Sequence, residues 1–265
     1  MSVLDGRLWF YTNYHCNLAC SYCLTESQPA APRRLLDRST IEALAADAGA
    51  LGFRSFGVTG GEPFVRRDMP EILETLGRRL PTVVLTNGTL FTSSAVARLA
   101  SVAALPVALQ ISIDSADAAT NDAARGPGNF ASASAGIRRL LAAGLQVRIG
   151  TTVDGSDPEG LERLCEWHRR LGIGDDDHIV RPILRRGRAL ARGLGVAAAF
   201  DDLPAELTIT AEGAFWSPAG ATVTAGSLDR DYLLTRTIRP LAIPARAMER
   251  CAEARTALEP ALRVT

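Results

Sequence analysis

The sequence has none of the features typical of secreted, membrane-spanning or nucleic-acid-binding proteins. Residues 1–6 show no basic segment followed by an apolar core, and no apolar run is long enough to span a bilayer. Basic and acidic residues balance at 29 each, which argues against long-range attraction to nucleic acid or to an anionic membrane. We therefore expect neither nucleic acid nor a membrane as a partner.

Cysteine is scarce, and three of the five cysteines lie between residues 16 and 23. This distribution is not that of a disulfide framework, so a reducing cytoplasm is the expected location. Cys16, Cys20 and Cys23 form a C-x₃-C-x₂-C run, which favours a [4Fe–4S] cluster with one iron left open for chemistry. The alternatives are a structural zinc site or three unrelated thiols. A closed zinc site needs a fourth ligand, and the side chain of the adjoining His15 would point away from the centre.

The other cysteines and the histidines give no metal-binding pattern. Cys165 lies in an amphipathic helical stretch, where core packing is the expected role. Cys251 is the lone cysteine of the C-terminal part. His15, His168 and His178 show no metal-ligand spacing. The sequence therefore predicts no second metal site and no auxiliary cluster.

Short apolar runs alternate with amphipathic helical patterns over the first 190 residues, as in repeated βα units with a parallel sheet. Strands are predicted at residues 8–14, 55–59, 82–86, 107–113, 146–153 and 179–184. Helices are predicted at residues 39–51, 69–80, 93–104, 131–143 and 158–171. Ser39 and Glu42 fit a capping box at the start of the first helix.

Six βα units predict an α/β fold, a partial (β/α)₆ barrel rather than a closed barrel of eight units. Beyond residue 190 the pattern changes to two short strands around a turn at residues 212–213, followed by a helix at residues 245–258. We predict a barrel domain at residues 1–190, which carries the cluster and cofactor sites. Residues 191–265 form a small hairpin-plus-helix extension that caps the barrel and contacts the substrate.

The polar motifs follow the predicted strands. The cysteine run comes after the first strand, Gly60-Gly61-Glu62 after the second, Asn87 after the third and Asp114 after the fourth. Because the loops at the carboxyl ends of parallel strands meet at one edge of the sheet, these motifs are expected to form one site.

These motifs resemble those of the radical S-adenosylmethionine (SAM) enzymes. Residues 14–23 (YHCNLACSYC) resemble the cysteine signature of that superfamily, and residues 59–63 (TGGEP) resemble its Gly-Gly-Glu element. Residues 86–88 (TNG) resemble the strand end that follows this element in the superfamily. The branch that contains GTP 3′,8-cyclase and the peptide-modifying SPASM/twitch-type maturases shares further motifs, which this chain matches at residues 112–115, 125–130 and 187–189. The chain lacks the auxiliary-cluster cysteines of that branch.

The resemblance implies an enzyme with a [4Fe–4S] cluster and SAM as cofactors. The reduced cluster would cleave SAM to a 5′-deoxyadenosyl radical, which abstracts hydrogen from a small-molecule or peptide substrate. A flavodoxin- or ferredoxin-type protein would supply the electron. The alternative is an iron–sulfur protein for electron transfer or sensing, without SAM turnover.

The resemblance also assigns cofactor-binding roles. Gly60 and Gly61 bring the backbone against the SAM amine, although an ordinary βα turn also favours this pair. Glu62 supports the same amine or stabilises the loop. Tyr22 packs near the adenine or in the core. The other candidate ligands of SAM are Asn87, Ser112, Asp114 and Arg125.

Some of these residues have a second interpretation, and the substrate-facing residues are less defined. Asp114 meets the ribose or carboxylate of SAM, or caps a turn with Ser115. Arg125 and Arg181 pair with an anionic group of SAM or substrate, or lie solvated at a rim. Further substrate contacts are expected in the extension and at Arg66 and Tyr232. Tyr232 and Cys251 are candidate catalytic residues, with Cys251 as a hydrogen-atom donor.

Overall fold

Six parallel strands form the centre of the computed structural model, which describes residues 3–262 and the side chains of residues 3–256. The strands are β1 (Arg7–Tyr11), β2 (Ser55–Thr59), β3 (Thr82–Thr86), β4 (Val107–Ser112), β5 (Gln146–Val153) and β6 (His178–Pro182). Each strand pairs in parallel with the next one along the chain. This arrangement confirms the predicted partial barrel, with some strand ends shifted by a few residues.

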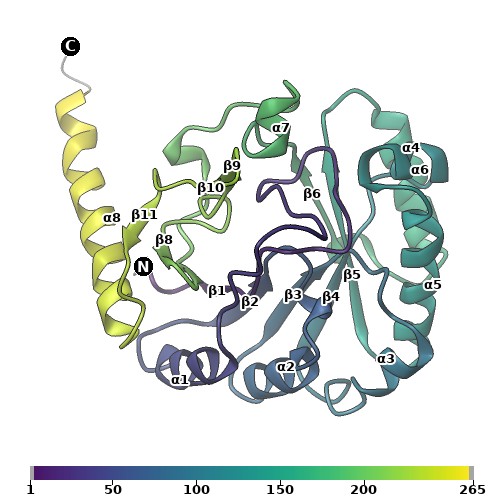
Figure 1. Ribbon diagram of the computed structural model, residues 1–265, viewed down its shortest axis with the longest axis horizontal. Helices are drawn as coiled ribbons and strands as arrows, with labels where there is room; N and C mark the ends of the chain where they lie inside the picture. The colour runs from purple at the N-terminus through teal and green to yellow at the C-terminus, as the bar shows by residue number, and fades with distance from the viewer. Residues whose placement is uncertain (1–2, 263–265) are drawn as a thin grey trace.

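Helices connect the strands along the outer side of the sheet, as Figure 1 shows. They are α1 (Arg38–Ala48), α2 (Met69–Gly77), α3 (Ser93–Ala97), α4 (Ala118–Arg125), α5 (Asn129–Ala142) and α6 (Pro158–Arg169). The loop that carries the clustered cysteines lies on the inner side of the curved sheet (Figure 1).

Strand residues alternate between these two sides, as a period of two requires. On β1, Leu8 and Phe10 are fully buried in the hydrophobic core, and Phe10 packs against Phe56 of β2 with ring centres 5.7 Å apart. The intervening residues Trp9 and Tyr11 line a cavity on the inner side.

Two local predictions are wrong, and one helix was missed. The capping box at Ser39 does not form, because α1 begins at Arg38 and Ser39 lies inside its first turn; Glu42 instead accepts a hydrogen bond from Arg38 at 2.6 Å. α3 ends at Ala97, well before residue 104, and continues only as turns. The short polar helix α4 was not predicted, because its sequence lacks a continuous apolar stripe.

The C-terminal part extends the same sheet. The predicted hairpin forms from β7 (Thr208–Thr210) and β8 (Gly213–Phe215), and β7 pairs in parallel with β1. Together with β11 (Leu233–Thr235), these strands give the order β11-β8-β7-β1-β2-β3-β4-β5-β6. The C-terminal part therefore contributes three strands to the sheet of the barrel.

The remaining elements lie around this sheet. A second small hairpin consists of β9 (Val223–Thr224) and β10 (Ser227–Leu228), and α7 (Arg188–Ala191) lies close to the cysteine loop. The long helix α8 (Ala242–Leu262) packs against β11 at the outer edge (Figure 1). Within the described part of the chain, no helix has both the length and the apolar character to cross a membrane.

Candidate active site

The clustered cysteines lie in the long loop between β1 and α1, and all three line one cavity of about 550 Å³. Within this loop, the Ser27 hydroxyl donates to the Tyr14 carbonyl at 2.6 Å. Residues at the carboxyl ends of β2, β3 and β4 line the same cavity. The structure thus brings the cysteine run and the other strand-end motifs to one edge of the sheet.

The sulfur atoms of Cys16, Cys20 and Cys23 do not form a compact ligand set for a single metal ion in this structure. Among the described residues, one group of three metal-ligand side chains has all its ligand atoms within 4.8 Å of one another, and this group does not include the clustered cysteines. At least one pair of the three cysteine sulfurs is therefore more than 4.8 Å apart. Two thiolates bound to one zinc ion at about 2.3 Å are at most about 4.6 Å apart. A polynuclear cluster does not need such a compact set, because separate iron atoms take separate thiolates.

Burial keeps the thiols of Cys16 and Cys20 protonated until a metal binds. The pKa of Cys16 is raised to about 12, first by burial and then by the charge of Glu62. Burial also raises the pKa of Cys20, although the nearby Arg125 lowers it in part. Cys16 Sγ accepts a hydrogen bond from the Leu18 amide at 3.3 Å. Binding of a cluster therefore releases protons from these residues.

Gly60 and Gly61 pack directly against the backbone that leads into the cysteine run. A Cβ atom at Gly60, whose φ is +145°, would lie 2.4 Å from the Asn13 carbonyl oxygen. A Cβ atom at Gly61 would lie 2.1 Å from the His15 carbonyl oxygen. The Gly61 amide also donates to the Asn13 carbonyl at 2.9 Å. Only glycine permits this close contact between the two loops.

Glu62 is fully buried and connects the Gly-Gly turn to the end of β3. Its carboxylate accepts hydrogen bonds from the Thr86 hydroxyl at 2.7 Å, the Asn87 amide at 2.8 Å and the Phe64 amide at 3.0 Å. Burial raises its pKa, and these donors lower it in part. The side chain does not line the cavity. Of the two predicted roles, the contacts match loop stabilisation.

Asn87 contacts the cysteine loop through its side chain. Its Nδ2 donates to Cys16 Sγ at 3.6 Å and to Asn17 Oδ1 at 2.9 Å. Its Oδ1 accepts hydrogen bonds from the amide and the hydroxyl of Thr89. Asn87 thus lines the cavity and orients Cys16 at the same time.

Asp114, Arg125 and Tyr22 form a hydrogen-bonded network at the side of the cavity. The Asp114 carboxylate accepts two hydrogen bonds from Arg125, one from the Tyr22 hydroxyl and one from the Thr152 amide at 2.9 Å. Burial raises the pKa of Tyr22, so the phenol stays protonated and donates. Burial lowers the pKa of the Arg125 guanidinium, but the Asp114 carboxylate raises it, and the net pKa lies above the usual value.

The predicted cofactor-binding residues divide into two groups. Those that line the cavity are Tyr22, Gly60, Gly61, Asn87, Ser112 and Arg125. Glu62 and Asp114 do not line the cavity, and their oxygen atoms are occupied by protein donors. The Ser115 hydroxyl accepts from the Asp117 amide, whereas the Asp114 carboxylate is bonded to Arg125 and other donors, so the contacts do not match the alternative in which Asp114 caps a turn with Ser115.

The candidate catalytic residues Tyr232 and Cys251 do not line the cavity. Tyr232 is buried beside Phe200, with ring centres 5.1 Å apart, and Arg186 lies over its ring. Cys251 lies on α8 and packs against the hydrophobic core. The structure therefore places neither side chain where it would meet a substrate in this cavity.

Arg66 holds together the two ends of the cysteine loop instead of meeting substrate. It is buried, and its Nη1 donates to the carbonyl oxygens of Thr12 at 3.0 Å and Leu36 at 2.6 Å. Its Nε and Nη2 pair with Asp68. The substrate contact predicted for Arg66 is wrong, because all its nitrogen atoms face protein acceptors. Arg181 is exposed and lines the cavity.

The motif at residues 187–189 has a structural role that the sequence did not predict. The Arg188 guanidinium donates to the carbonyls of Cys20 and Ser27, and its amide donates to the Cys23 carbonyl at 2.9 Å. A Cβ atom at Gly187 would lie 2.3 Å from the Leu24 carbonyl oxygen. The family resemblance of this motif was the available signal, and its contacts explain why these residue types occur there.

The C-terminal part supplies another portion of the cavity lining. Its lining residues are Asp202, Leu203, Pro204, Glu206, Pro218 and Ala219. Glu206 accepts a hydrogen bond from Trp9 Nε1 at 2.6 Å, which joins this part to β1. The lining is thus mixed, with apolar and charged side chains from both parts of the chain.

Residues 11–168 match the family model described as the Radical SAM superfamily. The chain belongs to the radical SAM superfamily. Members of this superfamily use a [4Fe–4S] cluster and SAM, and the match begins at the end of β1 and includes all three clustered cysteines. The resemblance inferred from the motifs is confirmed.

Curated radical SAM relatives match the barrel part. GTP 3′,8-cyclase of Rhodopseudomonas palustris (strain TIE-1) is 35% identical over 164 residues, which are 60% of this chain and 48% of that protein. Mycofactocin maturase MftC of Mycolicibacterium smegmatis is 32% identical over 161 residues, 60% of this chain and 40% of that protein. The chain spans about half the length of the curated relatives it matches.

Solved structures share the fold. Streptococcus suis SuiB bound to its precursor peptide SuiA has a TM-score of 0.57 at 20% identity, covering 68% of this chain and 39% of SuiB. The structure of anSMEcpe with bound AdoMet and the Cp18Cys peptide has a TM-score of 0.62 at 13% identity, covering 91% of this chain and 79% of that chain. At these identities the likeness establishes the radical SAM fold alone.

Proposed function

We propose that this chain is a radical SAM enzyme that removes a hydrogen atom from a peptide substrate. The observation that carries the proposal is that Cys16, Cys20 and Cys23 share one cavity with Gly60 and Gly61. When bound, the cluster and SAM supply a carbon-centred radical for hydrogen abstraction. The electron-transfer alternative receives no support from the family, the relatives or the structures named above.

Each cavity residue has a proposed task. The three cysteines hold the cluster, and the backbone of Gly60 and Gly61 faces the amino group of SAM. Tyr22 packs against the adenine, since its ring lines the cavity and its hydroxyl is fixed by Asp114.

The polar cavity residues orient the rest of SAM. Ser112 faces the ribose from the end of β4, and Asn87 fixes Cys16. Arg125 uses Nε and Nη2 for Asp114, and its Nη1 meets the SAM carboxylate. Glu62 and Asp114 act as positioning residues, because their contacts are with the protein groups that surround the cavity.

A peptide is the proposed substrate class, and residues 191–265 are its proposed contact region. The lining residues Leu203, Pro204 and Pro218 offer apolar surface, whereas Glu206 and Arg181 offer charge of both signs. This mixture suits a peptide, which carries both side chains and a polar backbone. SuiB and anSMEcpe, which share the fold, have each been solved with a bound peptide. A flavodoxin- or ferredoxin-type protein is the proposed reductant.

Reductive cleavage of SAM tests the proposed activity. Chain reconstituted anaerobically with iron and sulfide is expected to form 5′-deoxyadenosine from SAM when dithionite is added. Cys20→Ala is expected to abolish the product, whereas Cys251→Ala, a cysteine outside the cavity, is expected to retain it. A correctly formed cluster that leaves SAM intact in the wild-type chain would exclude the proposal.

A further inference from the structure

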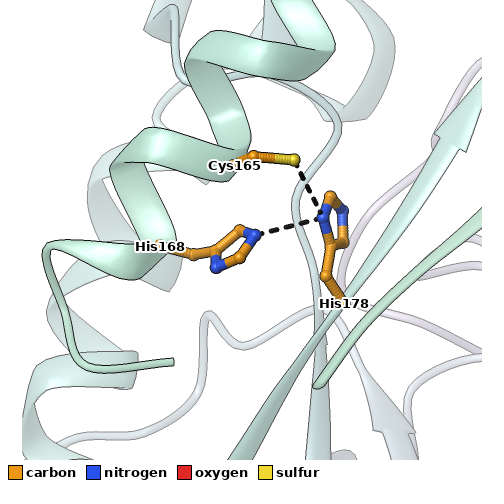
Figure 2. Close-up of side chains that lie close together, drawn as sticks. All are labelled: Cys165, His168 and His178. Atoms are coloured by element: carbon orange, nitrogen blue, oxygen red, sulfur yellow. Dashed lines mark hydrogen bonds between the residues drawn. The ribbon is translucent and has the colours of Figure 1, made fainter. Parts of the chain in front are cut away.

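A second group of metal-ligand side chains lies outside the active-site cavity. Cys165 and His168 occur one turn apart on α6, and His178 begins β6 (Figure 2). Their ligand atoms all lie within 4.8 Å of one another. Sγ of Cys165 is 3.5 Å from Nδ1 of His178, which is 3.1 Å from Nε2 of His168.

Hydrogen bonding fixes both imidazole rings with lone pairs toward the centre of this group. His168 Nδ1 lies 2.9 Å from the Ile173 carbonyl, which only accepts, so Nδ1 carries the proton and Nε2 is a lone pair. The Thr151 hydroxyl gives its single proton to the Ile113 carbonyl at 2.7 Å. It therefore accepts from His178 Nε2 at 2.8 Å, which leaves a lone pair on His178 Nδ1.

Two lone pairs that face each other at 3.1 Å repel unless a proton or a metal ion lies between them. His168 is fully buried, so water does not relieve this repulsion at its ring. The third member of the group, Cys165, contributes a sulfur atom, which is a soft ligand when deprotonated. Two oriented imidazoles and a thiol are the donor types that zinc prefers.

We propose that Cys165, His168 and His178 bind one Zn²⁺ ion. Tetrahedral zinc with bonds of about 2.0 Å to nitrogen and 2.3 Å to sulfur places its nitrogen ligands roughly 3.3 Å apart and its sulfur and nitrogen ligands roughly 3.5 Å apart. The observed separations of 3.1 Å and 3.5 Å match this geometry. Ile173 and Thr151 supply the outer hydrogen bonds that orient ligating histidines.

The fourth ligand is a water molecule. Cys165 and His178 are only partly buried, so one side of the group is accessible to solvent. Of the neighbouring acidic residues, Asp175 forms a bidentate ion pair with Arg169, and Glu162 pairs with the same guanidinium. Both carboxylates add negative potential near the ion without supplying a ligand.

Zinc at this position joins α6 to the edge of the sheet. β6 pairs with β5 alone in the order of the main sheet, and His178 is its first residue. The same strand ends at Arg181 and Pro182, which line the active-site cavity. The ion would therefore fix the edge strand that shapes this side of the cavity.

Zinc uptake by the cluster-loaded chain tests the site, because the cluster then occupies Cys16, Cys20 and Cys23. After dialysis against Zn²⁺ with a competing chelator, elemental analysis is expected to find one zinc per chain. Absorption at the zinc K-edge is expected to show one sulfur and two imidazole nitrogens. Zinc is also expected to raise the melting temperature.

Substitutions at the two partly buried ligands identify the site without removing the buried His168. Cys165→Ala and His178→Ala are each expected to weaken zinc binding at least tenfold and to abolish the rise in melting temperature. Cys251→Ala, a cysteine on α8, is the matched control and is expected to bind zinc as the wild-type chain does. Absence of zinc from the wild-type chain, or zinc binding by Cys165→Ala and His178→Ala as tight as that of the wild-type chain, overturns the proposal.

Discussion

The guanidinium of Arg125 donates two hydrogen bonds to the Asp114 carboxylate, from Nε at 2.7 Å and from Nη2 at 3.0 Å. Both side chains are almost fully buried, at 6% and 10% exposure. The pair therefore links the end of β4 to α4, and the backbone of α4 touches the cysteine loop where the Ser21 amide donates to Ala124. We therefore expect the positions of the residues that line the cavity to depend on this buried ion pair.

Asp114→Asn is expected to lower the free energy of unfolding by about 3 kcal/mol, because it leaves the buried Arg125 charge without a counterion. Chemical denaturation of the reconstituted chain measures the loss, and SAM affinity should fall with it. Arg54→Gln removes an exposed partner of Asp5 and is the matched control, with no measurable change expected. Equal stability of Asp114→Asn and wild type would contradict a supporting role for the pair.

Arg66→Gln is expected to impair cluster retention, because Arg66 binds the carbonyls at both ends of the cysteine loop. The substitution also leaves the two carbonyls without their hydrogen-bond donor, which is expected to lower the free energy of unfolding by about 3 kcal/mol. Iron content and visible absorbance after anaerobic reconstitution measure retention. The exposed neighbour Arg67 offers the control Arg67→Gln, which should retain the wild-type cluster content. A cluster content of Arg66→Gln equal to that of the wild-type chain would show that the ends of the loop stay in place without Arg66.

Gly61→Ala is expected to cost about 2–3 kcal/mol of stability, because its Cβ would overlap the backbone of His15, which cannot rotate away. SAM binding should weaken as the Gly-Gly turn moves. Gly49→Ala is the control, since no atom lies within 4 Å of a Cβ atom there and the φ of −62° suits alanine. Thermal melting and SAM titration of both variants distinguish a steric effect from a general effect of alanine.

The raised pKa of Glu62 predicts a particular dependence of stability on pH. The unfolded chain loses this proton at about pH 4.3, whereas the buried residue keeps it to a higher pH. The folded chain binds this proton more tightly than the unfolded chain, which stabilises the fold. This stabilisation is fully present below the unfolded pKa and is lost as pH rises through the folded pKa. The free energy of unfolding of Glu62→Gln should lack this decrease with rising pH when it is measured over the mildly acidic range. Parallel pH profiles for the two chains would be inconsistent with the raised pKa.

The parts of the fold that depend on local sequence could be predicted. The β-branched run Thr82–Thr86 is a strand with the predicted bounds, and the Ser55–Thr59 strand ends at the Gly-Gly turn as expected. The spacing of the clustered cysteines likewise indicated a shared site. In each case the signal lies within a few consecutive residues.

The parts that depend on long-range contacts could not be predicted. Pairing of β7 with β1 joins residues about two hundred positions apart, which no periodicity reveals. The role of Arg66 depends on the carbonyls of Thr12 and Leu36, and backbone acceptors leave no sequence pattern. Cys165 and His168 are one helical turn apart, but their partner His178 comes from a strand, so spacing alone did not indicate a metal site.

The parallel pairing of β7 with β1 also affects the order in which the protein is assembled during translation. Phe10 aligns with Ile209, so β1 gains its β7 neighbour only after about two hundred further residues have been synthesised. Until then one edge of β1 has unpaired backbone groups, which chaperones or another nascent chain can bind. Cluster insertion into the adjoining loop is therefore expected to be a late step of biogenesis.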